Sequence, residues 1–198
     1  MEALPGKTEG LRERKRRDTL ERIVETGLRL FIEKGYEAKT LDAIAVAAGI
    51  SRRTFFYYFK SKEEVLLARQ DGGFQQALRF ALLACSPSQT PLDAVRECLL
   101  GLASNYETKE SIVIDRLMLS TDALRARKEA RFIEMERTLV EAMGVVWPEP
   151  EQRDALRTVA MMAIGTLRLS LEDWREGNAK HPLAYYLKRR FTFLARLL

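Results

Sequence analysis

Helical periodicity runs through almost the whole chain, and it constrains the fold more than any other feature. Apolar residues recur every three to four positions, and strand-like alternation is absent over any useful length. Gly and Pro punctuate the pattern, most clearly at residues 147–150. After a first helix that ends at Gly35, the expected helices span residues 41–47, 51–59, 61–84, 91–104, 107–119, 122–144, 152–176 and 183–197. The sequence therefore predicts an all-α protein of about nine helices.

The net positive charge is confined to the N-terminal third. Residues 1–62 hold 14 Lys and Arg against 9 Asp and Glu, whereas residues 63–198 hold 19 of each. Such an asymmetry favours a segment that faces a polyanion, attached to a neutral body. A merely solvated basic face is the alternative at this point.

Composition excludes several classes of site. Cys85 and Cys98 are too few for a disulfide framework or a zinc quartet and suit a reducing compartment. His181 is the one histidine, which excludes His-rich metal sites and leaves a hydrolase a single candidate base. Neither a signal peptide nor a run of about 18 apolar residues is present. We expect a cytoplasmic protein with no membrane contact, metal, cofactor or catalytic residue.

Residues 40–62 have the spacing of two short helices joined by a tight turn. Steeply crossed helices need a small residue where they meet, and Ala45 is placed for that. The turn needs a residue with positive φ, which Gly49 supplies without steric penalty. The apolar residues expected on the inner face are Ile44, Ala48, Ile50, Phe55 and Phe59.

Two arginines occupy the first turn of the second short helix. The helix dipole disfavours Arg52 and Arg53 at that end by a few tenths of a kcal/mol, so an anion in front of them is the better explanation. In helix-turn-helix proteins these positions point at base edges, and Arg is the usual reader of guanine. The alternative is a pair of solvated arginines.

Residues 12–68 resemble the DNA-binding domain of TetR-family repressors. The matching residues are Phe31-x-x-x-Gly35-Tyr36, Thr40, Ile44-Ala45-x-x-Ala48-Gly49-Ile50-Ser51, Thr54-Phe55-Phe56-Tyr57-Tyr58-Phe59 and Ser61-Lys62-Glu63. The resemblance implies a disordered arm at residues 1–10, a three-helix DNA-binding domain at 11–62 and a ligand-sensing and dimerisation domain at 63–198. It also implies a bacterial, ligand-responsive repressor that a small-molecule effector releases from a palindromic operator in double-stranded DNA, with activation left open as the alternative.

The resemblance further implies individual DNA contacts. Thr40, Thr54, Tyr58 and Lys62 are expected at phosphates, although Thr40 could serve only as a helix cap and Tyr58 only as a core residue. Tyr57 is expected at a sugar, a phosphate or a thymine methyl. Many members have tyrosine at Phe56, so packing or an apolar base contact is expected there. The remaining expected contacts are Ser51, Arg52, Arg53 and a flexible basic arm with Arg14, Arg16 and Arg17, for which a solubilising tail is the alternative.

The last two expected helices, 152–176 and 183–197, are apolar around most of their girth. Such helices are buried on two sides, and the resemblance implies a homodimer built from them. The run Lys188-Arg189-Arg190 would also suit a membrane-surface helix, but we prefer the end of a dimer helix.

The resemblance places a small-molecule effector of unknown identity among residues 74–172. The placeholders for its pocket are Phe80, Tyr106, Arg116, Met118, Met162 and Arg168, for which core packing or ion pairing is the alternative. Two rival functions remain open: an all-α enzyme, which needs convergent polar groups in the body, and a helical adaptor without DNA binding.

Overall fold

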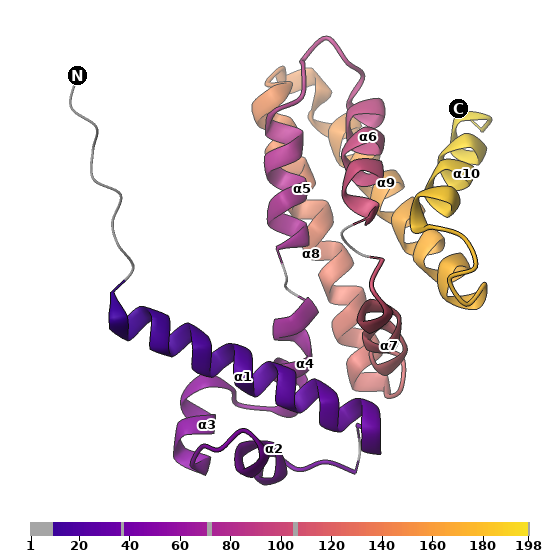
Figure 1. Ribbon diagram of the computed structural model, residues 1–198. Helices are drawn as coiled ribbons and strands as arrows, with labels where there is room; N and C mark the ends of the chain where they lie inside the picture. The colour runs from indigo at the N-terminus through magenta and orange to yellow at the C-terminus, as the bar shows by residue number, and fades with distance from the viewer. Residues whose placement is uncertain (1–9, 37, 71–72, 105–106, 198) are drawn as a thin grey trace. The chain divides into compact units, whose positions relative to one another are not determined.

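The computed structural model describes residues 10–36, 38–70, 73–104 and 107–197, and it divides the chain into two compact units at Gln70 and Asp71. Ten α-helices and one short 3-10 helix make up the regular structure of these residues, without strands (Figure 1). The expected all-α class is therefore confirmed. None of the described helices is both long and apolar enough to cross a bilayer.

The first unit contains four helices around one small core. Their bounds are α1 Leu11–Lys34, α2 Leu41–Ala47, α3 Arg52–Tyr58 and α4 Lys62–Gln70 (Figure 1). Helix α1 packs against α2 and α4, and α2 packs against α3. The fully or almost fully buried side chains include Ile23, Phe31, Ile44, Phe55, Val65 and Leu66. The core thus draws on all four helices.

The turn between α2 and α3 has the geometry that its sequence predicts. Gly49 adopts φ +67°, and the Ala45 side chain is buried. The N–H of Gly49 donates to the Val46 carbonyl, and the N–H of Ile50 donates to the Ala45 carbonyl, both over 3.0 Å. These two bonds form the usual glycine-ended helix stop, which satisfies carbonyls that the end of α2 would otherwise leave unpaired.

Gly27 lets α1 approach its neighbours closely. A Cβ atom at this position would lie 2.6 Å from Val65 Cγ1 and 3.6 Å from Ile44 Cγ2. Val65 is a buried, β-branched residue, so its methyl group cannot rotate away freely. The absence of a side chain at Gly27 therefore sets the spacing between α1, α2 and α4.

The second unit is a helical bundle. Its helices are α5 Phe74–Leu83, α6 Pro91–Ala103, α7 Lys109–Leu117, α8 Asp122–Val146, α9 Arg153–Glu176 and α10 Leu183–Ala195, with the 3-10 turn at Pro150–Gln152. Helix α8 packs against α5 and α9, and α10 packs against α9 and α6 (Figure 1). One continuous apolar core runs through these helices and includes Leu82, Leu99, Leu139, Met143, Ile164 and Leu187.

A buried ionic cluster attaches α7 to this bundle. The Asp115 carboxylate accepts a hydrogen bond from Lys128 on α8 and another from Arg175 Nη1 on α9, the latter over 2.6 Å. Both cationic side chains are largely buried. Removal of Asp115 would leave two desolvated cations without their counter-charge. The carboxylate therefore links α7 to α8 and α9.

The structure corrects two expectations about helix boundaries. The single helix expected at residues 61–84 is two helices, since α4 ends at Gln70 and α5 begins at Phe74, with Gly73 at φ +82° as the N-cap of α5. The residues expected in a flexible arm before the first helix, Arg14 to Arg17, lie in the first two turns of α1. The other helices agree with the expected ranges to within two residues at most ends.

Replacement of Gly27 by alanine is expected to destabilise the first unit by about 1–3 kcal/mol, because the added methyl overpacks the contact with Val65. Gly144 on α8 is the matched control, since its Cβ would meet no atom within 4 Å. Gly144→Ala should be neutral or stabilising by up to about 1 kcal/mol through helix propensity. Urea unfolding followed by circular dichroism measures both. A Gly27→Ala protein as stable as the parent would show that the close approach is not a constraint.

Candidate nucleic-acid interface

Helix α3 is anchored on one side and bare on the other. Ser51 caps its N-terminus, where Ser51 Oγ accepts a hydrogen bond from the Thr54 N–H over 3.1 Å. Phe55 and Phe59 are buried, with ring centroids 6.0 Å apart. Because these two phenylalanines fill the inner side, the outer side is left to Arg52, Arg53, Phe56 and Tyr57, all of which are exposed. The expected division of the helix between core and surface therefore holds.

The outer face of α3 carries one guanidinium that is already paired and one that is not. Arg52 Nε lies 3.2 Å from Asp42 Oδ1 on α2, and the Arg52 guanidinium carbon lies 5.6 Å from the centre of the Phe56 ring. Arg53 is exposed, and within the described residues no ion pair holds its side chain. Asp42 thus supplies the anion for Arg52 from within the chain. Arg53 is left free to meet an anion or a base from another molecule.

Threonine hydroxyls stand at the starts of α2 and α3. Thr40 Oγ1 accepts a hydrogen bond from the Ala43 N–H over 3.2 Å, which makes Thr40 the N-cap of α2. The hydroxyl proton of Thr40 is not used by that bond, so it can still be donated to an anion. Thr54 Oγ1 lies 2.8 Å from Ser51 Oγ, so one of these two hydroxyls is engaged with the other.

Lys62 lies at the start of α4 and contacts the segment that follows α1. Its ammonium donates to the Tyr36 carbonyl over 3.1 Å and lies 4.2 Å from the centre of the Tyr36 ring. The side chain is half-buried. Lys62 therefore fastens the loop before α2 to α4, a structural role that the sequence did not reveal.

The neighbouring Glu63 keeps its charge despite partial burial. Burial acts to raise the pKa of Glu63, but hydrogen bonds from Tyr36, from its own backbone N–H and from Ser61, together with the Lys62 ammonium, hold that pKa below its usual value. A negative charge within the first turn of α4 is also favoured by the helix dipole. The start of α4 therefore carries two neighbouring opposite charges, the Lys62 ammonium and the Glu63 carboxylate.

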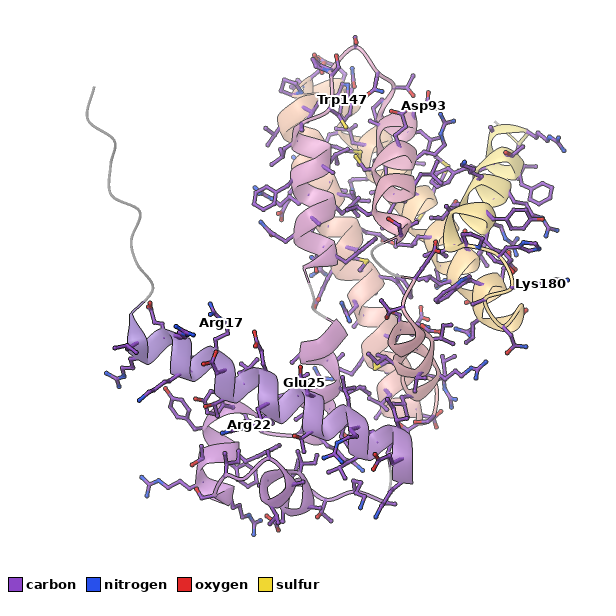
Figure 2. The ribbon with its side chains drawn as sticks, viewed as in Figure 1. Arg17, Arg22, Glu25, Asp93, Trp147 and Lys180 are labelled. Atoms are coloured by element: carbon purple, nitrogen blue, oxygen red, sulfur yellow. The ribbon has the colours of Figure 1, made fainter. Side chains whose placement is uncertain are left out.

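The basic residues of α1 lie on an exposed helical surface. Arg14, Arg16 and Arg17 are all exposed, and Figure 2 shows Arg17 on the N-terminal part of α1. The guanidinium carbon of Arg16 lies 6.0 Å from the centre of the Tyr57 ring on α3. The start of α1 therefore approaches the outer face of α3. We call the exposed residues of these two helices the α1–α3 face; they are Arg14, Arg16, Arg17, Arg52, Arg53, Phe56 and Tyr57. Tyr58, the neighbour of Tyr57, is half-buried.

The placeholders for an effector pocket do not meet at one place. Phe80 is 59% exposed, Met118 is fully buried and Met162 is half-buried. Arg116 Nη2 donates to Asn178 Oδ1 over 2.7 Å, and Arg168 Nη1 pairs with Glu129 over 2.9 Å. Tyr106 lies outside the described residues. Ion pairing or hydrogen bonding thus occupies both arginines.

A different set of residues encloses an apolar cavity in the second unit. Nine apolar side chains from α5, α6, α8, α9 and α10 line it, among them Phe74, Ala103, Phe132 and Leu171. The space inside is about 20 Å³, room for about one water molecule. The sequence could not single these residues out, because a Leu or Phe that lines a cavity has the same helical spacing as one that fills the core.

Known proteins match both units. The model of the tetR family of bacterial regulatory proteins matches residues 23–68, and the model of the MftR C-terminal domain matches residues 89–198. The transcriptional regulator TcmR of Streptomyces glaucescens is 33% identical over 135 residues, which cover 64% of this chain and 59% of TcmR. The chain thus spans less than two thirds of this curated relative.

Solved structures show a similar arrangement of helices. The fatty acid degradation regulator FadR of Bacillus halodurans superimposes with a TM-score of 0.62 at 20% identity, over 95% of this chain and 96% of FadR. The FadR repressor of Thermus thermophilus, solved with lauroyl-CoA, gives 0.54 at 24% identity, over 89% and 93%. The helix-turn-helix unit followed by a helical bundle is therefore a fold that these regulators share.

The chain belongs to the TetR family of transcriptional regulators, as the family models that match its two units show. Regulators of this family bind DNA and small-molecule effectors and are typically dimeric.

Ser51→Ala is expected to lower the free energy of unfolding of the first unit by about 1 kcal/mol, because the N-cap bond to Thr54 is lost. Ser51→Asn is the matched variant, since asparagine caps helices as well as serine does. Urea unfolding of the two variants beside the parent measures the difference. Equal stability of the alanine and asparagine variants would show that Ser51 does not fix the start of α3.

Proposed function

We propose that this chain is a DNA-binding transcriptional repressor, which binds as a homodimer to a palindromic operator and is released by an apolar small molecule. The observation that carries the proposal is the α1–α3 face. Arg53 and Tyr57 lie on the outer side of α3, whose inner side is anchored in the core. The exposed arginines of α1 lie nearby, with Arg16 6.0 Å from the centre of the Tyr57 ring. A rigid helix with exposed cations and aromatic edges suits the major groove.

The α1–α3 face supports two kinds of contact. Arg53 lies in the first turn of α3, where helix-turn-helix proteins place the side chains that reach base edges. The Thr40 hydroxyl and the exposed arginines of α1 suit phosphates, which carry no sequence information but fix the register of the protein on the duplex. In our proposal the Arg52 guanidinium leaves the Asp42 carboxylate when DNA binds and contacts a phosphate instead.

The outer faces of α9 and α10 support the homodimer. Met161, Met162, Gly165 and Leu169 follow helical spacing along α9, and none of them is fully buried in the single chain. On α10 the exposed Tyr185 and Phe193 lie on the side opposite the buried Leu187. Exposed apolar side chains along two neighbouring helices favour an association site, and a two-fold dimer suits a palindrome. We propose these two helices as the dimer interface.

The cavity in the second unit supports an apolar effector. All nine of its lining side chains are apolar, so it offers nothing to a strongly polar ligand. Pockets for small molecules usually measure about 300–1,000 Å³, so the lining must move apart on binding. A ligand that binds only the expanded form shifts the protein toward it, and a lower DNA affinity of that form releases the operator. The lauroyl-CoA in the Thermus thermophilus FadR structure carries an apolar acyl chain, and only that part of it resembles the effector proposed here.

The protein is expected to select a two-fold symmetric site from random duplex DNA, with affinity that falls steeply as salt rises. Arg53→Ala should weaken binding to the selected duplex by about 5- to 150-fold, corresponding to about 1–3 kcal/mol for a guanine contact. Asp42→Asn should strengthen binding to the same duplex by about two- to fivefold at low salt, because it removes the anion beside Arg52. Fluorescence anisotropy with a labelled duplex measures both.

Arg137→Ala on α8 is the control, because it removes the same charge from an exposed site outside the first unit and should leave affinity nearly unchanged. If Arg53→Ala and Arg137→Ala behave alike, or if no duplex is selected, α3 does not read DNA.

Met161→Glu is expected to raise the dimer dissociation constant by about 100-fold or more, because an uncompensated carboxylate in an interface costs about 3 kcal/mol or more. Ile133→Glu on α8 is the matched control, since Ile133 is 51% exposed and Met161 is 58% exposed. Analytical ultracentrifugation at micromolar concentration distinguishes the two variants. A parent protein that sediments as a monomer, or equal effects of both variants, would remove α9 from the interface.

A further inference from the structure

The two cysteines of the chain lie in contact within the second unit. Cys85 follows the C-terminal end of α5, Cys98 lies in the middle of α6, and their Sγ atoms are 3.6 Å apart. Both are free thiols. We propose that Cys85 and Cys98 form a redox modification site, at which a hydroperoxide converts the pair into a reversible intrachain disulfide between α5 and α6. This proposal does not depend on the proposed DNA binding.

The two thiols differ in access, which assigns them different parts in the reaction. Cys85 is half-buried, at the end of the helix, whereas Cys98 is buried at 8% exposure. Burial, followed by the hydrogen bond with Cys85, raises the pKa of the Cys98 thiol to about 12, so Cys98 is a poor first nucleophile near neutral pH. Cys85 is therefore the thiol that meets the oxidant, and Cys98 is the resolving thiol.

The atoms balance in two steps. In the first, the Cys85 sulfur attacks one oxygen of hydrogen peroxide, the O–O bond breaks, and the second oxygen leaves as water with the thiol proton, so Cys85 becomes a sulfenic acid. In the second, the Cys98 sulfur attacks the Cys85 sulfur, the S–O bond breaks, and hydroxide leaves as water with the Cys98 proton. The two sulfurs together lose two electrons, which the peroxide gains.

The surroundings hold the pair in place for this reaction. Cys85 Sγ donates to the Ala81 carbonyl over 3.4 Å, and its N–H donates to the Leu82 carbonyl over 3.0 Å. The loop that follows is fixed by Trp147 Nε1, which donates to the Pro87 carbonyl over 3.0 Å. Figure 2 shows Trp147 at the end of the bundle where Asp93 also lies. The end of α5 and the loop after it are thus attached to α8.

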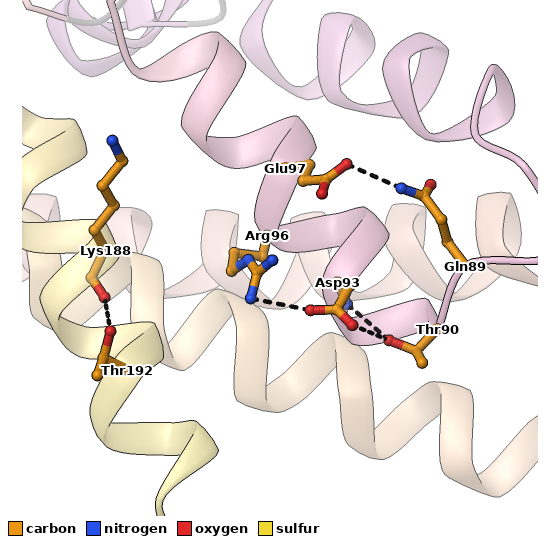
Figure 3. A network of polar contacts seen from close by, with 7 residues as sticks. All are labelled: Gln89, Thr90, Asp93, Arg96, Glu97, Lys188 and Thr192. Atoms are coloured by element: carbon orange, nitrogen blue, oxygen red, sulfur yellow. Dashed lines mark hydrogen bonds and ion pairs between the residues drawn. The ribbon is translucent and has the colours of Figure 1, made fainter.

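The start of α6 is fixed by a network of its own (Figure 3). Thr90 Oγ1 caps the Asp93 N–H over 3.2 Å, and Asp93 pairs with Arg96 over 3.0 Å. Gln89 Nε2 donates to Glu97 over 3.0 Å, which ties the loop to the residue next to Cys98. A disulfide requires the two sulfurs, now 3.6 Å apart, to close to about 2.05 Å.

Metal binding is the less favoured use of the pair. Among the described residues, no group of three or more His, Cys, Asp or Glu side chains is placed to hold a metal ion. Two thiols without further ligands do not complete the tetrahedral site that zinc prefers. The contact between the sulfurs therefore points to oxidation.

The test uses the full chain, reduced and then treated with hydrogen peroxide. Its intact mass should fall by about 2 Da, the two thiol hydrogens, and a dithiol reductant should restore it. Trypsin cuts after Arg79, Arg96 and Lys109, so the cysteines lie on separate peptides, 80–96 and 97–109, that only a disulfide can join. Conversion of the Cys85 sulfenic acid into the disulfide should be at least about tenfold faster in the folded protein than in guanidinium, because the fold holds the sulfurs in contact.

Single replacements test the order of the two steps. In Cys98→Ala the Cys85 sulfenic acid has no partner, so dimedone should label Cys85; in Cys85→Ala, Cys98 should resist labelling. A gain of about 16 Da on peptide 80–96 or 97–109, neither of which contains methionine, would overturn the proposal if the two peptides stay unlinked. A bond between two chains, or equal rates of disulfide formation from the sulfenic acid in folded and unfolded protein, would overturn it as well. Equal labelling of the two variants would overturn the assignment of Cys85 as the first thiol.

Discussion

The burial of Phe55 and Phe59 is the interaction on which the α1–α3 face depends. Helix α3 has only seven residues, too few to be stable on its own, so its existence and its orientation both come from packing. Phe55 and Phe59 are both buried and lie one turn apart. Truncation of either one to alanine would lower the free energy of unfolding by about 3–5 kcal/mol. Because they fix the inner side, Arg53 and Tyr57 must lie outside.

The same core also limits how much α3 can move. The glycine-ended stop of α2 and the Ser51 cap fix the turn between α2 and α3, and the close approach at Gly27 fixes α2 against α1. Lys62 adds a contact from α4 to the Tyr36 carbonyl. A recognition surface held in this way is pre-organised, so binding requires little ordering of the backbone.

The sequence predicted most of the first unit because each local signal there has one physical meaning. Gly49 can supply positive φ, Thr40 and Ser51 can cap, and Phe55 and Phe59 share a face, and the structure shows all of these. The pairing of Arg52 with Asp42 was missed because the two residues are ten positions apart on different helices. The contact between Cys85 and Cys98 was missed for the same reason, since helix packing decides it.

The second unit was less predictable because its helical spacing is ambiguous. The break at Gly73 divides a segment that reads as one helix, and the apolar stripe of α9 does not distinguish core from cavity wall or dimer surface. Ile164 and Leu167 lie on the same apolar stripe of α9 and both are buried, yet of these two residues Leu167 alone lines the cavity. Distances between helices, which periodicity does not encode, make that difference.

Hydroxyl-radical footprinting on the duplex that the protein selects tests most directly whether the α1–α3 face is the DNA-binding surface. We expect two protected patches related by two-fold symmetry, about one helical turn (about 34–36 Å) or a multiple of it apart. Both should be lost together in Arg53→Ala at concentrations that saturate the parent protein. A single patch, or a footprint that Arg53→Ala leaves unchanged, would contradict the assignment of α3 to the major groove.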